Sequence, residues 1–126
     1  MAELRDMPVF STLEADELSQ LLDHGSWITA APGEAIVEQG AVGDAFYAIR
    51  SGQAQVTRDG VPIASLGPGS HFGEVALLRN VPRTASVIAR TPLRAFRLDR
   101  EGFDAVVRGV FSQGKLKAPV DKTWQH

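Results

Sequence analysis

One acid and one base stand inside the most apolar segment of the chain. The stretch HFGEVALLRNVPRTASVIA, residues 71–89, carries Glu74 and Arg83 nine positions apart, each flanked by small or apolar residues. Arginine suits a phosphate group, because its planar guanidinium can hold two oxygens at once. A carboxylate repels phosphate but can accept a hydrogen bond from a sugar hydroxyl. This pair therefore predicts a site for a nucleotide with one small phosphate group.

The residues around this pair leave room for a ligand to approach the backbone. A short helix is expected to begin at Glu74, and the first N–H groups of a helix lack partners and attract anions. Gly73 and Ala76 keep those groups accessible, and Thr84 adds a hydroxyl beside Arg83, where a strand is expected to begin. The alternative is a buried Glu74–Arg83 salt bridge that binds nothing, which is a poor stabiliser because of its desolvation cost.

Other patterns that could carry chemistry fail on spacing or context. GPGSHFG, residues 67–73, lacks the third glycine of a dinucleotide-binding loop, because Phe72 occupies that position. GVFSQGKL, residues 109–116, resembles a phosphate-binding P-loop, but Leu116 replaces the metal-holding Ser or Thr and a helix is expected before it. The three histidines, at positions 24, 71 and 126, are too scattered to suggest a metal site. The sequence therefore indicates binding and not catalysis.

The composition is that of a small globular domain. Of the 126 residues, 44% are apolar and 22% are charged, and the formal net charge of -2 provides no general attraction to nucleic acid or anionic membranes. No cysteine is present, which excludes disulfides, thiolate metal sites and thiol catalysis. The N-terminus, MAELRDMPVF, resembles neither a signal peptide nor a membrane span. We therefore expect a soluble, cytoplasmic protein.

The first predicted element is a helix over residues 11–25. Ser11 or Thr12 is expected to cap its start, with Glu14 completing a capping box, and Gly25 to supply a left-handed stop. The apolar face of this helix should consist of Leu13, Leu18, Leu21 and Leu22.

After residue 25, glycine and proline divide the chain into short strands. They are predicted over residues 26–30, 34–39, 44–50, 54–58, 62–66, 83–90 and 93–99. Asp59-Gly60 should form the turn of a hairpin. A second helix is expected over residues 100–111, with one apolar face made of Phe103, Val106, Val107 and Val110. This order contains no β-α-β alternation and favours a sandwich or barrel.

Residues 72–87, FGEVALLRNVPRTASV, resemble the phosphate-binding cassette of cyclic nucleotide-binding domains. That cassette has F-G-E, an aliphatic residue, A-L and then P-R-[AST]-A, with the same Glu-to-Arg spacing in typical members. The similarity extends over roughly residues 7–111. MPVFSTLEADELSQLL resembles the N-terminal helical element, and PGEAIVEQGAVGDAFYAIRSGQAQV contains the G-x-x-G-D and F-Y-x-I-x-S-G signatures of the first hairpins. Several motifs agree in order, so the match is specific.

The resemblance implies a mainly β fold, an eight-stranded jelly-roll-like β-barrel with flanking N- and C-terminal helices. The domain would span residues 1–111, and residues 112–126 would be a tail or the remnant of a lid helix. Gly114 and Pro119 weaken helix formation there, so the lid is expected to be short or truncated, or else Leu116 or Trp124 covers the base in another way. The ligand-binding residues implied by the resemblance are Phe72, Gly73, Glu74, Val75, Ala76, Arg83, Thr84 and Ala85.

The resemblance also implies roles within this set. Glu74 would bind the ribose 2′-hydroxyl, and Arg83 the cyclic phosphate together with the backbone amides of Ala76 and Ala85. Thr84 would contact the phosphate or, in guanine-tolerant members, the base. Val75, with Leu77, is expected to pack within the cassette.

The resulting hypothesis is a cyclic nucleotide sensor that prefers cAMP to cGMP. Binding would shift the terminal helices against a fused or partner effector domain. The chain alone would not be an enzyme, would need no metal or cofactor beyond its nucleotide ligand, and would contact neither nucleic acid nor membrane.

Three alternatives differ in what they require. A degenerate scaffold of the same fold would pair Glu74 with Arg83. A catabolite-activator-type transcription regulator needs a helix-turn-helix, for which the roughly 15 residues after Phe111 are too few. A cupin-like enzyme needs clustered metal ligands.

Overall fold

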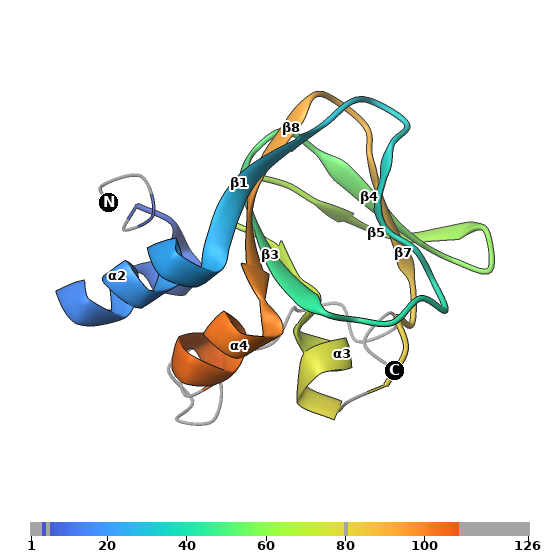
Figure 1. The fold of residues 1–126 in the computed structure, drawn as a ribbon. Coiled ribbons are helices and arrows are strands. Elements are labelled where there is room, and N and C mark those ends of the chain that lie inside the picture. Colours follow the sequence, from blue (N-terminus) through green and yellow to red (C-terminus); the bar gives the residue numbers. More distant parts are fainter. Residues whose placement is uncertain (1–3, 5, 80, 109–126) are drawn as a thin grey trace.

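The computed structural model describes residue 4, residues 6–79 and residues 81–108 (Figure 1). Within them, eight strands form two four-stranded antiparallel sheets. The first sheet has the order β1 (Gly25–Ala30), β8 (Leu93–Asp99), β3 (Ala45–Ser51) and β6 (His71–Phe72). The second has the order β2 (Ala35–Val37), β7 (Ser86–Ala89), β4 (Ala54–Arg58) and β5 (Val61–Leu66).

The predicted mainly β, jelly-roll-like architecture is confirmed, with one correction. The strands form two separate hydrogen-bonded sheets instead of one closed barrel. The seven predicted strands are present within a few residues of their expected bounds, and β6 was not predicted because it is only two residues long. Arg83 does not begin a strand, since β7 starts at Ser86. The hairpin turn between β4 and β5 is confirmed, and both Asp59 and Gly60 adopt positive φ, 54° and 79°.

The N-terminal helix begins and ends differently from the prediction. Residues Pro8–Phe10 form a 3-10 turn, η1, and the Ser11 hydroxyl donates to the Pro8 carbonyl, so Ser11 does not cap the helix. Helix α2 runs from Ala15 to His24. The capping box is shifted by three residues, because the Glu17 carboxylate accepts from the Glu14 backbone N–H at 2.9 Å. Gly25 is extended (φ -134°) and starts β1, so the predicted left-handed stop is wrong.

Side chains of α2 and of the C-terminal helical segment pack on the first sheet. Leu13, Leu18 and Leu21 are buried as predicted, but Leu22 is 45% exposed. After β8 the chain forms α4 (Arg100–Gly102) and a π-helical turn, η2 (Phe103–Val107). Three residues of the predicted apolar face, Phe103, Val106 and Val107, are buried. Val110, the proposed boundary at residue 111 and the proposed lid residues Leu116 and Trp124 lie outside the described residues.

The two faces of the first sheet cover two different apolar clusters. Along β3, Ala45, Tyr47 and Ile49 face the space between the sheets, and Phe46 and Ala48 face the helices. The inner core, between the sheets, consists of Ala30, Val37, Ala45, Tyr47, Ile49, Ala54, Val56, Leu66, Phe72, Ala85, Val87, Ala89, Leu93 and Ala95. The outer core, beneath the helices, consists of Leu4, Met7, Val9, Phe10, Leu13, Leu18, Leu21, Phe46, Ala48, Leu77, Phe96, Leu98, Phe103, Val106 and Val107.

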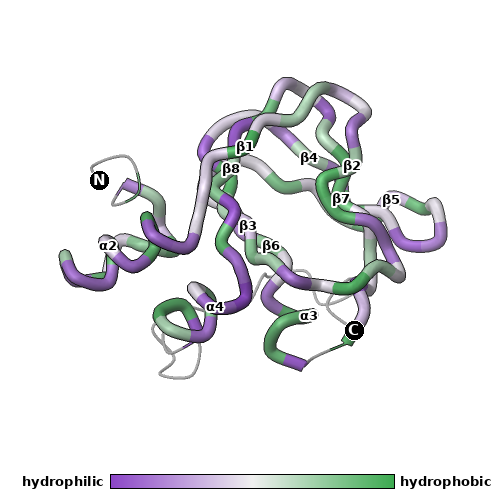
Figure 2. The backbone as a smooth tube through the Cα atoms, in the orientation of Figure 1, coloured by the Kyte–Doolittle hydropathy of each residue, from purple (hydrophilic) through white to green (hydrophobic). Residues whose placement is uncertain are grey.

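Hydropathy follows this arrangement along the chain. Helix α3 (Glu74–Arg79) and strand β7 are hydrophobic over most of their length (Figure 2). These two elements flank the segment that carries Arg83, so a cation is placed beside the inner core. In the described part of the chain, no helix has the length and apolar character to cross a membrane.

Candidate ligand-binding site

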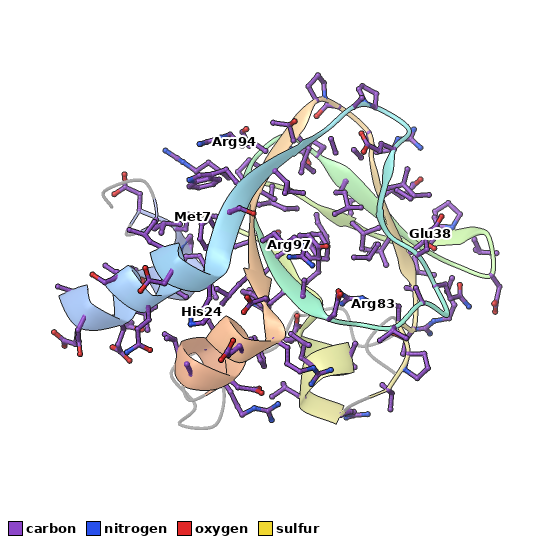
Figure 3. The ribbon with its side chains drawn as sticks, in the orientation of Figure 1. Met7, His24, Glu38, Arg83, Arg94 and Arg97 are labelled. Carbon is purple, nitrogen blue, oxygen red and sulfur yellow. The ribbon has the colours of Figure 1, made fainter. Side chains whose placement is uncertain are left out.

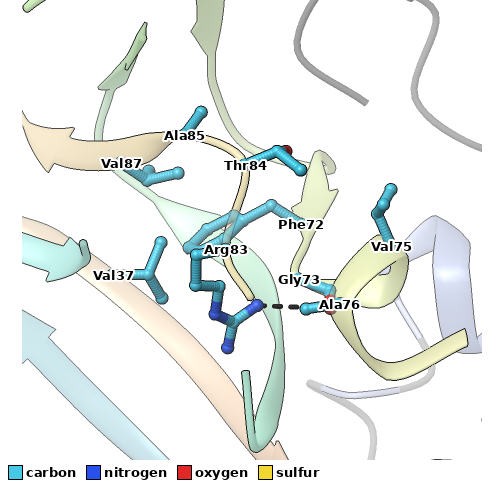
Figure 4. Close-up of a pocket in the computed structure, with 9 residues that line it drawn as sticks. All are labelled: Val37, Phe72, Gly73, Val75, Ala76, Arg83, Thr84, Ala85 and Val87. Atoms are coloured by element: carbon cyan, nitrogen blue, oxygen red, sulfur yellow. Dashed lines mark hydrogen bonds between the residues drawn. The ribbon is translucent and has the colours of Figure 1, made fainter. Parts of the chain in front are cut away.

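The predicted cassette joins the two sheets at one end of the molecule. From β6 of the first sheet, the chain passes through Gly73 into helix α3 and then reaches β7 of the second sheet. A hollow that is open to solvent, called the ligand hollow here, lies against this segment (Figure 4). It is lined by Val37, Phe72, Gly73, Val75, Ala76, Arg83, Thr84, Ala85 and Val87.

Arg83 is a buried cation held by backbone carbonyls. Only 7% of the surface of Arg83 is exposed. Its side chain lies in the space between the two sheets, well apart from Arg94 of β8 (Figure 3). Nη2 donates to the Ala45 carbonyl at 2.7 Å, and Nη1 donates to the Gly73 carbonyl at 3.2 Å. These two bonds use two of the five N–H donors that a guanidinium carries.

Burial lowers the pKa of Arg83 from its ordinary value, because desolvation penalises the charged form. The nearby Tyr47, Asp44 and Glu74 act in the opposite direction and favour the charge. Arginine nevertheless stays protonated in proteins. Its positive charge is therefore compensated at close range by carbonyl dipoles and not by a carboxylate of the described chain, which favours an incoming anion.

Gly73 brings the backbone against this guanidinium. Its φ is +100°, a conformation that side-chain-bearing residues rarely adopt. A Cβ at this position would lie 2.7 Å from the Ala45 carbonyl oxygen and 2.8 Å from Arg83 Nη1. The close approach predicted for Gly73 is thus found between Gly73, strand β3 and Arg83.

Glu74 begins α3 as predicted, but its side chain is fully buried and does not line the ligand hollow. Both carboxylate oxygens lack a hydrogen-bond partner, and Oε2 lies 3.6 Å from His71 Nδ1. The alternative of a Glu74–Arg83 salt bridge is wrong, because Arg83 instead donates to the carbonyls of Gly73 and Ala45.

The structure brings seven of the eight predicted site residues to one surface. Glu74 is the exception, and its two neighbours, Gly73 and Val75, both line the hollow. Val75 was expected to pack and instead lines the hollow, whereas Leu77 is buried in the outer core as expected.

Sequence reasoning missed contributors from other elements. Val37 of β2 and Val87 of β7 complete the wall of the hollow, and the Ala45 carbonyl of β3 anchors Arg83. No local signal marks these residues, because every predicted strand contains an alanine and several contain a valine. Among the described residues, no group of three His, Cys, Asp or Glu side chains could hold a metal ion.

Comparison with known proteins gives a family. The model of the cyclic nucleotide-binding domain matches residues 27–109. The cAMP-dependent protein kinase regulatory subunit of Yarrowia lipolytica is 38% identical over 118 residues, which are 92% of this chain and 32% of that protein. That of Aspergillus fumigatus is 41% identical over 104 residues, 81% of this chain and 25% of that protein. The chain thus spans about a quarter to a third of the length of these curated relatives.

Solved structures agree with this fold. The regulatory subunit of a cAMP-independent protein kinase A from Trypanosoma brucei superposes with a TM-score of 0.83 at 29% identity, covering 90% of this chain and 42% of that one. The regulatory domain of Toxoplasma gondii protein kinase A with cAMP gives 0.80 at 27% identity, covering 90% and 47%. The family model matches, the fold is shared, and the cassette that leads to Arg83 is present. The chain therefore belongs to the cyclic nucleotide-binding domain family.

Proposed function

We propose that this domain binds a cyclic nucleotide in the ligand hollow, cAMP in preference to cGMP, and acts as a regulatory sensor. The observation that carries the proposal is the position of Arg83, a buried guanidinium on the wall of the hollow with no carboxylate bonded to it. A buried charge is costly unless it is paired. A singly charged cyclic phosphate would supply the missing partner and use the donors of Arg83 that the backbone leaves over.

The rest of the hollow suits a nucleoside. Ala76 and Ala85 are small lining residues whose backbone would also approach the phosphate, as the family resemblance implies. Val37 and Val87 offer an apolar surface to the base, and Thr84 adds a hydroxyl. We propose that Glu74, between the lining residues Gly73 and Val75, accepts the 2′-hydroxyl of the ribose.

The relatives favour cAMP as the ligand. The two curated relatives described above, from Yarrowia lipolytica and Aspergillus fumigatus, are named as cAMP-dependent protein kinase regulatory subunits, and the Toxoplasma gondii structure contains cAMP. The kinase from Trypanosoma brucei is described as cAMP-independent, yet its regulatory subunit is bound to cAMP after three substitutions. Two of them convert a glutamate to alanine and a threonine to arginine, with the same spacing as Ala76 and Arg83 in this chain.

The proposed output is a change in the helices that cover the first sheet. Arg83 bonds to the Ala45 carbonyl, and the next residue, Phe46, packs on Phe103 of η2 with ring centroids 5.5 Å apart. A phosphate on Arg83 would therefore act two contacts away from the C-terminal helical segment. A ligand shifts such an equilibrium only by its difference in affinity for the two arrangements. We propose that a fused or partner effector domain, in the cytoplasm, responds to this shift, and that the domain itself is not catalytic and needs no metal.

Isothermal titration calorimetry of the purified chain with cAMP, cGMP and guanosine tests the proposal. We expect saturable binding of cAMP with one site, weaker binding of cGMP, and no binding of guanosine, which lacks the phosphate that Arg83 would hold. Guanosine is included because a related regulatory subunit from Trypanosoma cruzi is bound to it. Silence with both cyclic nucleotides would support the scaffold alternative instead.

Thr84→Ala should sharpen the preference for cAMP. The Thr84 side chain lines the hollow, where its hydroxyl can serve a guanine base. Losing a hydrogen bond of this kind costs about 1 kcal/mol, so we expect cGMP affinity to fall about fivefold to tenfold while cAMP affinity changes little. Competition binding with both nucleotides measures this ratio. Thr57→Ala, a partly buried threonine of β4 outside the hollow, is the matched control. Equal losses for both nucleotides would instead assign the hydroxyl to the phosphate.

A further inference from the structure

The side chain of His71 is fixed directly beside Glu74. His71 belongs to β6, where it lies opposite Ala48 of β3, and its ring packs on Phe46 with centroids 5.6 Å apart and planes tilted by 33°. Its Nδ1 lies 3.6 Å from Glu74 Oε2, and the two side chains are 9% and 0% exposed. Strand pairing and aromatic packing therefore hold the imidazole in place against the carboxylate.

The carboxylate of Glu74 needs hydrogen-bond donors that its surroundings do not supply. Both oxygens are sealed from solvent and accept no hydrogen bond. Leaving a charged acceptor in this condition is costly. His71 faces Oε2, so Oε1 is the oxygen left for another donor. The neighbours of Glu74 in the chain, Gly73 and Val75, both line the hollow, and a sugar hydroxyl is a donor of the right kind.

We infer that His71 is a positioning residue for nucleotide recognition, holding Oε2 of Glu74 so that Oε1 can accept the ribose 2′-hydroxyl. The inference rests on the proposed function, because it assumes that a cyclic nucleotide occupies the hollow. At 3.6 Å the contact is longer than a hydrogen bond and acts through electrostatic attraction. An N–H at Nδ1 stabilises the ionised carboxylate in one orientation. Histidine at position 71 thus selects for a ligand that carries this hydroxyl.

The test compares cAMP with 2′-deoxy-cAMP, which lacks only the hydroxyl in question. His71→Phe keeps an aromatic ring against Phe46 and removes the nitrogen. Hydrogen bonds to charged groups are the stronger ones, so we expect His71→Phe to lose about tenfold or more of the wild-type preference for cAMP. Affinity for 2′-deoxy-cAMP should stay within about threefold of wild type. Glu74→Gln should lose the same preference, and the double variant should lose little more, because the two residues act as one unit.

Conservative and matched variants separate positioning from packing. His71→Asn places an amide nitrogen near the position of Nδ1 and should restore most of the preference for cAMP. His24→Leu removes a histidine that contacts Asp99 and Glu101 instead, and it should leave the preference unchanged. Melting temperatures establish that each variant is folded, and His71→Leu replaces His71→Phe if the latter does not fold.

Three results would overturn the inference. Equal losses of both nucleotides in His71→Phe would make His71 a packing residue only. A stronger preference for cAMP in that variant would mean that His71 competes with the sugar for Glu74. If wild type binds neither cAMP nor 2′-deoxy-cAMP, the proposed function itself fails and the inference fails with it, an outcome distinct from the first two.

Discussion

Arg83→Ala should reduce the affinity for cAMP by about two to three orders of magnitude. Removing one member of a buried, hydrogen-bonded charge pair costs about 2–5 kcal/mol in complexes of this kind, and 1.4 kcal/mol corresponds to a factor of ten. The variant leaves the phosphate facing the carbonyls of Ala45 and Gly73, to which Arg83 donates in the wild type. Calorimetry at constant ionic strength, or competition binding if the affinity becomes too low, provides the measurement.

The control for this variant must remove the same charge elsewhere. Arg79 is the last residue of α3 and is exposed, so Arg79→Ala changes the net charge equally without touching the hollow. We expect cAMP affinity within about threefold of wild type for Arg79→Ala, because screened surface charges contribute little. Arg83→Lys should fall between wild type and Arg83→Ala, since a lysine lacks the planar fork that holds two oxygens. An Arg83→Ala variant that binds cAMP as tightly as wild type would contradict the proposed site.

Gly73→Ala should destabilise the fold and weaken ligand binding together. A non-glycine residue at φ +100° is strained by about 1–3 kcal/mol. The added methyl group would also lie 2.7 Å from the Ala45 carbonyl oxygen and 2.8 Å from Arg83 Nη1, so strand β3 or the guanidinium must move. We expect a loss of about 2–4 kcal/mol in the free energy of unfolding, measured by urea denaturation, and a weaker cAMP complex.

Gly33→Ala distinguishes strain from collision. Gly33 has a similar φ, +89°, but a Cβ there would meet nothing within 4 Å. This variant should lose only the strain contribution, about 1 kcal/mol or somewhat more, and should bind cAMP as wild type does. If Gly73→Ala proved no less stable than Gly33→Ala, the contact between Gly73 and Arg83 would not be as tight as the structure indicates.

Local patterns were sufficient for most of the fold. Alternating residues bounded by glycine and proline located seven strands, and the Asp59-Gly60 pair identified its hairpin, because both signals depend on neighbours in sequence. The start of α2 was misplaced because Ser11 and Glu14 satisfy the same capping pattern as the pair that is used, Glu14 and Glu17. Phe10 and Leu13, which precede α2, are both buried in the outer core.

The sequence predicts most of the residues that line the hollow, but not the contacts that these residues make. Seven of the cassette residues meet at one hollow because they lie within one short connection between the sheets. The partner of Arg83, the carbonyl of Ala45, is 38 residues away in sequence and offers no side-chain signal. In the sequence His71 is only one of three scattered histidines, since its relation to Glu74 depends on how β6 meets α3.

Strands β3 and β8 contribute side chains to both the inner and the outer core, so the first sheet lies between the two cores. Phe96 and Leu98 of β8 are covered on the helical side by residues such as Phe10, Leu18 and Leu21, all of which precede the segment matched by the family model, residues 27–109. A fragment cut to that segment would retain the residues that line the ligand hollow but expose the helix-facing side of the first sheet to water. Residues that lie outside the matched segment and far from the hollow therefore complete the burial of the sheet that supports it.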